Sequence, residues 1–389
     1  MKKETRIVNA GRDPRSNFGI VNPPVYHAST VIFPTVADLE SSENSPYEGV
    51  RYGRYGTPTT QAFEAAVAAL EGGERCVSFP SGLAAIACSL IAFLKAGDHV
   101  LVTDNVYGPT RGRLCDGLLK DFGVETTYYD PMIGSGIADL LRAETKVVFV
   151  EAPGSITFEV QDIPAIAAAA HAAGATVIMD NTWSGGLYFQ PFEHGVDVCV
   201  HAATKYIVGH SDAMLGAVTT TAALFEQVKS TAVQLGYAAG PDDCYLGLRG
   251  LRSIAARLPH HQENGLTIAR WIAERPEVEL LLHPAFPSCP GHEIWKRDFT
   301  GSSGLFALSL RNCSKNAVSA MLDGMELFGM GFSWGGFESL IVPTYPSRSR
   351  TATPWPHAEP GLRIHVGLEH PDDLIADLDK GFARMNRAA

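Results

Sequence analysis

The chain has 389 residues, of which 46% are hydrophobic and 19% charged, a composition typical of a globular protein rather than of a disordered chain or a coiled coil. Asp and Glu total 42 against 31 Lys and Arg, and the formal net charge of −11 disfavours binding to phosphate backbones. The longest apolar stretch, residues 83–94, is far shorter than the ~20 residues of a membrane span, and the charged N-terminus lacks the apolar segment of a secretory signal. We therefore expect a soluble, cytoplasmic protein that binds neither nucleic acid nor membrane, with room for two or three domains.

The seven cysteines are widely spaced, form no CxxC pair and do not cluster with histidines as zinc ligands do. Several lie in apolar runs, where a free cysteine is usually a small core residue. We therefore expect reduced cysteines that contribute to packing, and no metal site.

Residues 1–56 are rich in Pro, Ser, Asn and Gly and have no sustained helical or strand periodicity, which predicts an extended N-terminal arm. Residues 57–250 then alternate between helical segments and short apolar runs. Helices are expected from near 59 to the glycines at 72–73, at 83–94 and at 164–173, and strands at 75–79, 99–103, 125–129, 146–150, 175–179, 196–200 and 214–219. This alternation predicts a large α/β domain with a mostly parallel seven-stranded sheet that is covered on both faces.

The pattern changes again over residues 251–389. A long helical stretch at 253–275 is followed by Pro-rich and Gly-rich turns, the apolar run FALSL, a helix near 316–325, a strand at 362–366 and a helix from Pro371. This order predicts a smaller α+β C-terminal domain. Arg348 and Arg350 lie in a Pro-rich loop of this region and are expected to be solvated, the alternative being that they border the entrance to the site.

Chemically distinctive residues follow several of the expected strands. Asp180 and Lys205 each come just after a strand, and ligands of open parallel sheets bind at the carboxyl ends of the strands. A cofactor with an aldehyde and a pyridine ring needs this pair, a lysine for the Schiff base and a carboxylate that keeps the ring nitrogen protonated. Ser81-Gly82 begins a helix, where phosphate binds readily, and Tyr107 is placed to stack on a flat ring. Singly, these residues also fit a solvated lysine, a helix cap and a core tyrosine; together they indicate a cofactor site.

With these residues in place, the sequence resembles the Cys/Met-metabolism family of pyridoxal-phosphate (PLP) enzymes, most closely its cystathionine β-lyase branch. The resemblance runs from the arm to the C-terminus and implies the aspartate-aminotransferase fold, fold type I. It rests on the motifs YGRYGTPT (52–59), PSGLAA (80–85), EAPGSITFEV (151–160), MDNTW (179–183), ATKYIVGHSDAMLG (203–216), WKRDFTGSSGLF (295–306), FSWGGFESL (332–340) and RIHVGLE (363–369).

The resemblance implies pyridoxal 5′-phosphate as cofactor and a catalytic role for Lys205, which would bind the cofactor covalently and then move protons. Asp180 would pair with the ring nitrogen, and Tyr107 would stack on the ring and take part in catalysis. The groups implied to hold the phosphate are the backbone amides of Gly82 and Leu83 and the hydroxyl of Thr204.

The resemblance also implies a homo-oligomer with shared active sites, a dimer or a homotetramer built as a dimer of dimers. Tyr52 and Arg54 would reach the cofactor phosphate of the neighbouring subunit, which makes the arm a contact to that subunit. Arg363 would bind the substrate α-carboxylate through a bidentate fork. Further implied substrate contacts are Ser333, Trp334, Tyr52 and Arg111.

The implied function is a carbon–sulfur β-lyase of amino-acid metabolism, in transsulfuration and methionine biosynthesis. It would cleave cystathionine, or another cysteine thioether or S-conjugate, to a thiol (homocysteine), pyruvate and ammonia. One alternative within the family is a γ-lyase for methionine or cystathionine, or a γ-replacement enzyme such as a sulfhydrylase. An alternative of another class is a non-catalytic, PLP-binding regulatory homologue, which the complete set of Lys205, Asp180, Tyr107 and Arg363 disfavours.

Several positions depart from the family pattern. Ala202 stands where many relatives have a serine phosphate ligand, and Arg51 where β-lyases often have an aromatic residue. Gly108 follows Tyr107, and Arg111 and Arg113 stand where acidic or polar side chains contact the far end of cystathionine. We therefore expect a distal pocket that prefers a different substrate, including one with a distal negative charge.

A competing motif, Gly331-Phe332-Ser333-Trp334-Gly335, matches the GxSxG nucleophile elbow of hydrolases, with Glu359 and His365 in the order of a catalytic triad. An elbow needs a strand before it and a helix after it, and Gly335-Gly336 with the run SLIVP disfavours such a helix. The glycine motifs of dinucleotide-binding and P-loop proteins are absent from the sequence.

Overall fold

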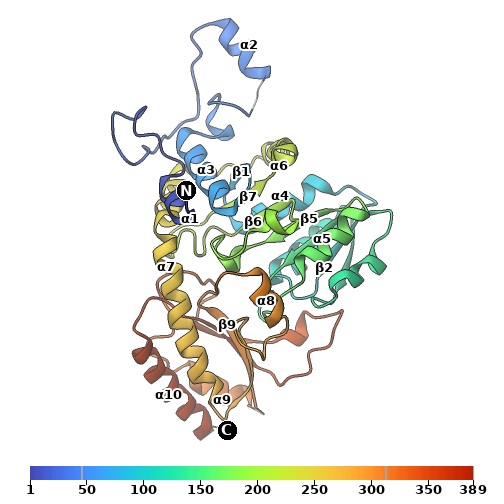
Figure 1. Ribbon diagram of the computed structural model, residues 1–389, viewed down its shortest axis with the longest axis vertical. Coiled ribbons are helices and arrows are strands. Elements are labelled where there is room, and N and C mark those ends of the chain that lie inside the picture. The colour runs from blue at the N-terminus through green and yellow to red at the C-terminus, as the bar shows by residue number, and fades with distance from the viewer. Residues whose placement is uncertain (45–46, 312, 389) are drawn as a thin grey trace.

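The computed structural model describes residues 1–44, 47–311 and 313–388, and two β-sheets organise it (Figure 1). The larger sheet has seven strands in the order β1-β7-β6-β5-β4-β2-β3. Only β7 runs antiparallel to its neighbours, so the prediction of a mostly parallel seven-stranded sheet is confirmed. The strands are β1 (Arg75–Phe79), β2 (His99–Thr103), β3 (Glu125–Tyr129), β4 (Thr145–Glu151), β5 (Thr176–Asp180), β6 (Val198–His201) and β7 (Gly216–Thr220).

Helices cover both faces of this sheet, and the strand sequences show why. In β4, Val147 and Phe149 face the core beneath α4 and α6, whereas Val148 and Val150 face the opposite core beneath α5. Since successive strand residues point to opposite faces, a strand covered on both sides needs an unbroken apolar run. The helices around the sheet are α3 (Pro58–Glu71), α4 (Gly82–Phe93), α5 (Ile163–Ala172) and α6 (Ala222–Gln234), with a π-helical segment at Thr110–Leu119.

The smaller sheet is antiparallel, in the order β10-β11-β9-β8. One of its faces packs against α9, α10 and the end of α7, which agrees with the expected α+β arrangement. Its elements are β8 (Val278–Leu282), α8 (His292–Asp298), β9 (Leu305–Leu310), α9 (Lys315–Leu322), β10 (Leu340–Thr344), β11 (Gly361–His365) and α10 (Pro371–Ala388).

Helix α7 (Pro241–Ala273) joins the two sheets as one continuous rod, yellow in Figure 1. It begins well before the helix expected at 253–275, and it passes through residue 250 without interruption. The division into 57–250 and 251–389 therefore falls inside a helix and stays a prediction.

The N-terminal arm contains regular structure that the periodicity did not predict. Helix α1 (Lys3–Asn9) packs on α3 and α7 and buries Ile7, and Lys3 Nζ donates hydrogen bonds to the carbonyls of Gly186 (2.7 Å) and Leu187 (2.8 Å). With one buried apolar residue in seven, α1 is too short to produce a detectable pattern.

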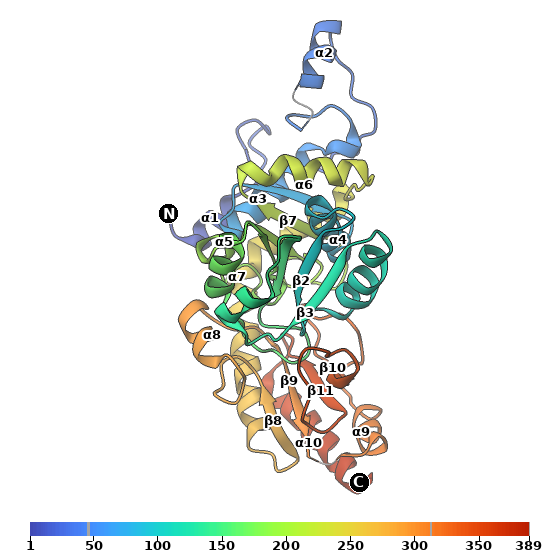
Figure 2. The same ribbon diagram turned by 90° about the vertical axis from the view of Figure 1, so that its right-hand side faces the viewer.

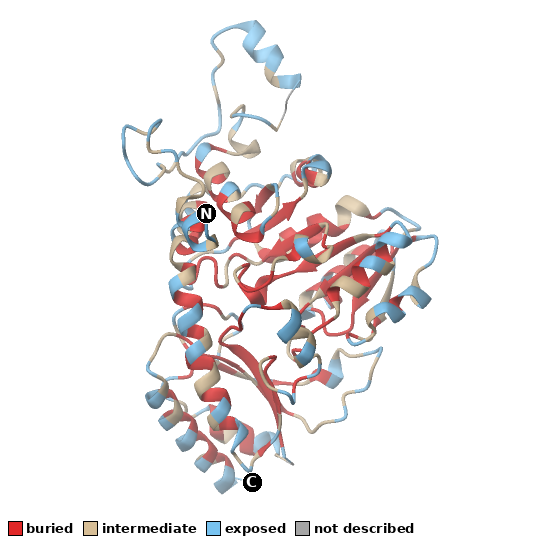
Figure 3. Ribbon diagram, viewed as in Figure 1, coloured by how far each residue is buried: buried red, intermediate tan, exposed pale blue. Residues whose placement is uncertain are grey.

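Helix α2 (Val36–Asn44) projects away from the rest of the chain (Figures 1 and 2). None of its described residues is buried, and the segment stands out in pale blue in Figure 3. Among the described residues, no helix combines the length and the apolar character needed to cross a membrane.

Candidate active site

A cavity of about 360 Å³ opens at the carboxyl edge of the large sheet. The large sheet contributes the start of α4 and the segments that end or follow β2, β4, β5 and β6. The C-terminal part contributes Leu305, Phe332, Trp334 and Arg363. The cavity therefore lies where open α/β sheets bind ligands, and residues from both sheets line it.

The N-terminus of α4 forms one end of the cavity. Ser81 caps the helix, since its side chain accepts a hydrogen bond from the amide of Ala84 (3.1 Å). A Cβ at Gly82 would lie 2.8 Å from Cα of Ala202, so glycine is needed for this close approach. Gly82 and Leu83 line the cavity at a helix end that carries no acid in its first turn, which suits a phosphate group.

Thr204 lines the same cavity, and its hydroxyl is held by the backbone of Leu215, the residue before β7. Its Oγ1 accepts from the amide of Leu215 (2.9 Å) and donates to the Leu215 carbonyl (3.1 Å). This exchange fixes the turn that carries Lys205.

Lys205 extends into the cavity and contacts the C-terminal part. Its Nζ donates to Ser333 Oγ at 2.8 Å and lies 5.3 Å from the centre of the Trp334 ring. Burial, assisted by the positive charge of Arg363, lowers the pKa of Lys205 from 10.5 to about 8. A larger fraction of this lysine is therefore neutral and nucleophilic at neutral pH than of an exposed lysine.

We expect this lowered pKa to appear in the reactivity of the cofactor-free protein. Acetylation of Lys205 by acetic anhydride should rise with pH to a midpoint near 8, because only the neutral amine reacts. Arg363→Met should move the midpoint upward, because it removes a like charge. Mass spectrometry of the Lys205 peptide provides the measurement, and a midpoint above about pH 10, as for an ordinary lysine, would contradict the prediction.

Asp180 ends β5 and is buried. Its Oδ1 accepts from the amide (2.9 Å) and hydroxyl (2.5 Å) of Thr182, while Oδ2 has no hydrogen-bond partner among the described residues. Burial raises the pKa of Asp180, and the Thr182 hydrogen bonds and nearby positive charges oppose that rise. A protonated ring nitrogen bound in the cavity would donate the hydrogen bond that Oδ2 of Asp180 lacks.

Glu151, which the motif analysis did not single out, lies beside Asp180. It ends β4 in register with Asp180 on β5, lines the cavity, and accepts the backbone N–H of Tyr107 at Oε2 (2.8 Å). Burial and the neighbouring Asp180 raise the pKa of Glu151 well above its usual value. Its position at the end of a strand, like that of Asp180, is the sequence signal that could have identified Glu151 as a site residue.

Arg363, on β11, faces Lys205 from the small sheet. Its Nη2 donates to the carbonyls of Phe332 (3.2 Å) and Ser333 (3.4 Å), so the loop that carries Ser333 also holds the guanidinium. Burial lowers the pKa of Arg363, yet arginine stays charged at neutral pH. The guanidinium is therefore a cation inside the cavity, suited to a substrate carboxylate.

The hydrolase alternative is not supported by these contacts. Ser333 Oγ accepts a hydrogen bond from Lys205 Nζ. His365 Nε2, which a triad would direct at the serine, instead accepts a hydrogen bond from the amide of Gly335 (3.1 Å). The next regular element after Ser333 within the described chain is strand β10, so the helix that an elbow requires does not follow.

Three predicted site residues lie away from this chain's own cavity. Tyr52 is 42% exposed, and Arg54 Nη1 donates to the carbonyl of Val233 (2.8 Å). The guanidinium of Arg111 is buried against Asp104 (2.5 Å), and Arg111 is not among the described residues that line the cavity. Its predicted contact with the substrate stays a prediction, which this ion pair disfavours.

Comparison with known proteins agrees with this geometry. The sequence profile described as "Cys/Met metabolism PLP-dependent enzyme" matches residues 4–383. The chain belongs to this family. A putative cystathionine beta-lyase of Rhizobium johnstonii is 49% identical over 97% of this chain and 95% of its own length, and cystathionine beta-lyase MetC of Escherichia coli is 44% identical over 99% of both. The crystal structure of a cystathionine gamma synthase from Xanthomonas oryzae pv. oryzae, 31% identical over 100% of both chains, superposes with a TM-score of 0.91.

Membership of the Cys/Met metabolism PLP-dependent family confirms the fold and the cofactor expected from the motifs. The cavity fits PLP by its chemistry: it offers an amine of lowered pKa for the aldehyde and a helix N-terminus for the phosphate. It also offers the buried, half-satisfied carboxyl of Asp180 for the ring nitrogen.

Proposed function

We propose that this chain is a PLP-dependent carbon–sulfur β-lyase that converts cystathionine and water to homocysteine, pyruvate and ammonia. The observation that carries the proposal is the convergence of Lys205, Asp180 and Arg363 on one cavity. It is supported by the 44% identity to the Escherichia coli cystathionine beta-lyase over 99% of both chains. When bound, PLP supplies an electron sink that stabilises negative charge at the substrate α-carbon.

Each residue then has a defined task. Arg363 binds the substrate carboxylate, and Trp334 and Ser333 close the same side of the cavity. Lys205 would hold the cofactor aldehyde, and its amine would take up the substrate α-proton; Ser333 Oγ, 2.8 Å from Nζ, orients the amine. Tyr107, 41% exposed, lines the mouth of the cavity and would stack on the cofactor ring.

We further propose that Tyr52 and Arg54 serve the neighbouring subunit, in a dimer or a dimer of dimers. Support comes from the arm, where apolar side chains lie exposed: Phe18, Ile20, Val21, Ile32, Val36 and Leu39. An unpartnered apolar surface of this kind is typical of a protein interface. A cytoplasmic location fits the seven free cysteines, six of them buried.

The side chains that line the cavity suit a substrate whose end far from the α-carbon is neutral or apolar, as well as cystathionine. The only carboxyls among the described lining residues are Glu151 and Asp180, at the carboxyl ends of β4 and β5, and Met214 and Phe332 contribute exposed apolar surface. S-alkylcysteines should therefore be cleaved with a kcat/KM within about tenfold of that for cystathionine, since tenfold corresponds to roughly 1.4 kcal/mol.

A product assay tests the proposed reaction. PLP-loaded protein is incubated with cystathionine, and pyruvate, homocysteine and 2-oxobutyrate are quantified; the β-lyase yields pyruvate and homocysteine in equal amounts. Release of 2-oxobutyrate would instead assign the γ-lyase alternative, which uses the same cofactor residues. Absence of turnover with cystathionine, cystine and S-alkylcysteines would favour the non-catalytic homologue.

A further inference from the structure

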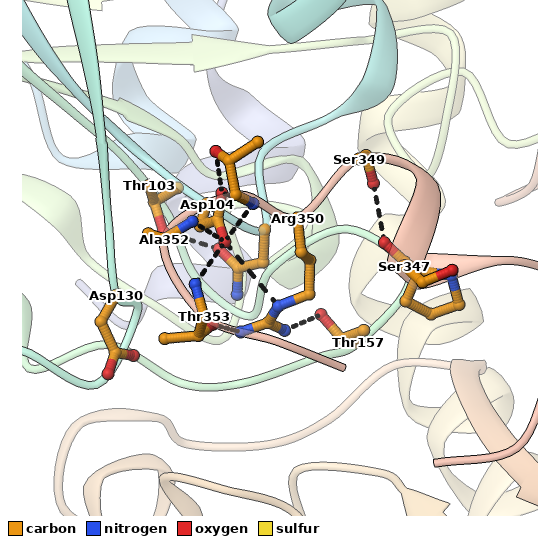
Figure 4. A network of polar contacts seen from close by, with 12 residues as sticks. Thr103, Asp104, Asp130, Thr157, Ser347, Ser349, Arg350, Ala352 and Thr353 are labelled. Atoms are coloured by element: carbon orange, nitrogen blue, oxygen red, sulfur yellow. Dashed lines mark hydrogen bonds and ion pairs between the residues drawn. The ribbon is translucent and has the colours of Figure 1, made fainter. Parts of the chain in front are cut away.

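Four buried charged side chains join the C-terminal part of the chain to the large sheet beside the cavity. Figure 4 shows two of them, Asp104 and Arg350, with the segment at Ala352 and Thr353. The four are Asp104, just after β2; Arg111, in the π-helical segment; Glu159, after β4; and Arg350, between β10 and β11. Their side chains are at most 8% exposed. Arg350, expected to be solvated, is thus enclosed, and the two cations balance the two carboxylates.

Asp104 fastens the segment that follows Arg350. Its carboxylate accepts the backbone amides of Thr351 (3.0 Å), Ala352 (2.9 Å) and Thr353 (3.2 Å), besides its ion pair with Arg111. Three successive amides on one carboxylate fix this stretch of chain directly against the end of β2. Tyr107, at the mouth of the cavity, lies three residues beyond Asp104.

Arg350 in turn braces the segment after β4. Its Nη1 pairs with Glu159 and reaches Thr157 Oγ1 (3.4 Å), and its Nη2 donates to Thr353 Oγ1 (2.5 Å). Glu159 Oε2 also accepts from Asn105 Nδ2 (3.0 Å). One guanidinium therefore ties together the segments that follow β2 and β4 and the loop before β11.

The braced segment is strained and forms a wall of the cavity. Ile156 and Phe158 have φ values of 70° and 58°, in the left-handed region that β-branched and aromatic residues rarely adopt. Both line the cavity, together with Gly154 and Ser155. Such conformations persist only where surrounding contacts enforce them. Arg350 supplies two such contacts, to Glu159 and Thr157, beside the backbone hydrogen bond from Ser155 to Asn105.

We propose that Arg350 and Asp104 are positioning residues for the reaction: across the junction between the two sheets, they hold the strained wall at 154–158 and the Tyr107 turn in their working arrangement. The alternative is that this cluster only adds stability. The two differ in whether disruption changes the cavity wall while the chain stays folded.

The test compares Arg350→Met with Arg297→Met by hydrogen–deuterium exchange and kinetics. Arg297, on α8, also pairs across the sheets, with Asp162 (2.8 Å), but neither residue is among the described residues lining the cavity. Arg350→Met should speed amide exchange at 154–158 about tenfold or more. It should also lower kcat/KM about 10- to 100-fold, as displaced positioning groups do. Arg297→Met should change neither, and Arg350→Lys should restore only part of the loss because lysine lacks the fork.

Thr353→Val is the milder variant if Arg350→Met does not fold, since it removes only the hydroxyl that accepts from Nη2. It should change exchange and kcat/KM in the same direction. A folded Arg350→Met or Thr353→Val protein with parental exchange at 154–158 and parental kcat/KM would overturn the proposal. The kinetic measurement rests on the proposed function, whereas the exchange measurement needs no substrate, so the two failures are distinguishable.

Discussion

Replacing Lys205 with alanine is expected to lower kcat/KM for cystathionine by at least about 10⁴-fold, because the variant loses both the covalent anchor and the base that removes the α-proton. The structure places Nζ in the cavity, bonded to Ser333 and close to the Trp334 ring. Pyruvate release by the PLP-supplemented protein provides the measurement.

Lys3→Ala is a matched control for this variant. Lys3 is a second lysine whose pKa burial lowers to about 8, but its Nζ bonds the carbonyls of Gly186 and Leu187 instead of entering the cavity. Its replacement should leave kcat/KM close to the parental value. If Lys205→Ala kept more than about 1% of the parental kcat/KM, another group would have to supply the base.

Glu71→Ala is expected to lower the free energy of unfolding by about 3 kcal/mol, because each buried group left without its partner costs roughly 1–3 kcal/mol. Glu71, fully buried at the end of α3, pairs with His201 and accepts hydrogen bonds from Cys199 Sγ (3.0 Å) and Asn181 Nδ2 (3.0 Å). The ligand-type atoms of Glu71, Cys199 and His201 lie within 4.8 Å of one another, and these mutual contacts account for the clustering. Urea denaturation measures the loss.

This carboxylate also predicts how stability depends on pH. Burial raises the pKa of Glu71, but the charge and hydrogen bond of His201, together with the hydrogen bonds from Cys199 and Asn181, outweigh burial and hold the pKa below 4.5. A depressed pKa in the folded state contributes stability above the unfolded value of 4.5, and that contribution is lost as the pH falls through the folded-state pKa. Glu71→Ala should therefore flatten the acid limb of the stability curve.

Glu326→Gln is the control for an ion pair outside the core. Glu326 and Lys380 are 3.1 Å apart, with 67% and 58% of their side chains exposed. Exposed pairs contribute about 0–1 kcal/mol, so this variant should unfold almost as the parent does. A loss below about 1 kcal/mol for Glu71→Ala as well would mean that water or repacking replaces its partners.

Local patterns were enough to predict the framework of the site. The strands 75–79, 99–103 and 125–129 begin and end where expected, because apolar runs between turn residues are a property of the chain itself. The same logic placed Asp180 and Lys205 at one edge of the sheet, since parallel strands bring their carboxyl ends together. Glu151 also ends a parallel strand, so the same reasoning could have predicted it as a site residue.

Other features depended on contacts between distant segments. Arg111 resembles a substrate contact in sequence, but Asp104 captures its guanidinium in the fold. Arg350 stands in a Pro-rich loop that suggests exposure, and only the meeting of that loop with the segment after β4 buries it. A charged side chain pairs with whichever opposite charge the fold brings near, and no local pattern encodes that partner.

The composition suggested a soluble protein with two or three domains. The sequence by itself determined the sheet, the cofactor chemistry and the family, because each of these depends on short stretches of chain. The tertiary structure decided which charges line the cavity and which brace its wall. Those choices depend on burial and on distances between residues far apart in sequence, where desolvation makes an ion pair specific.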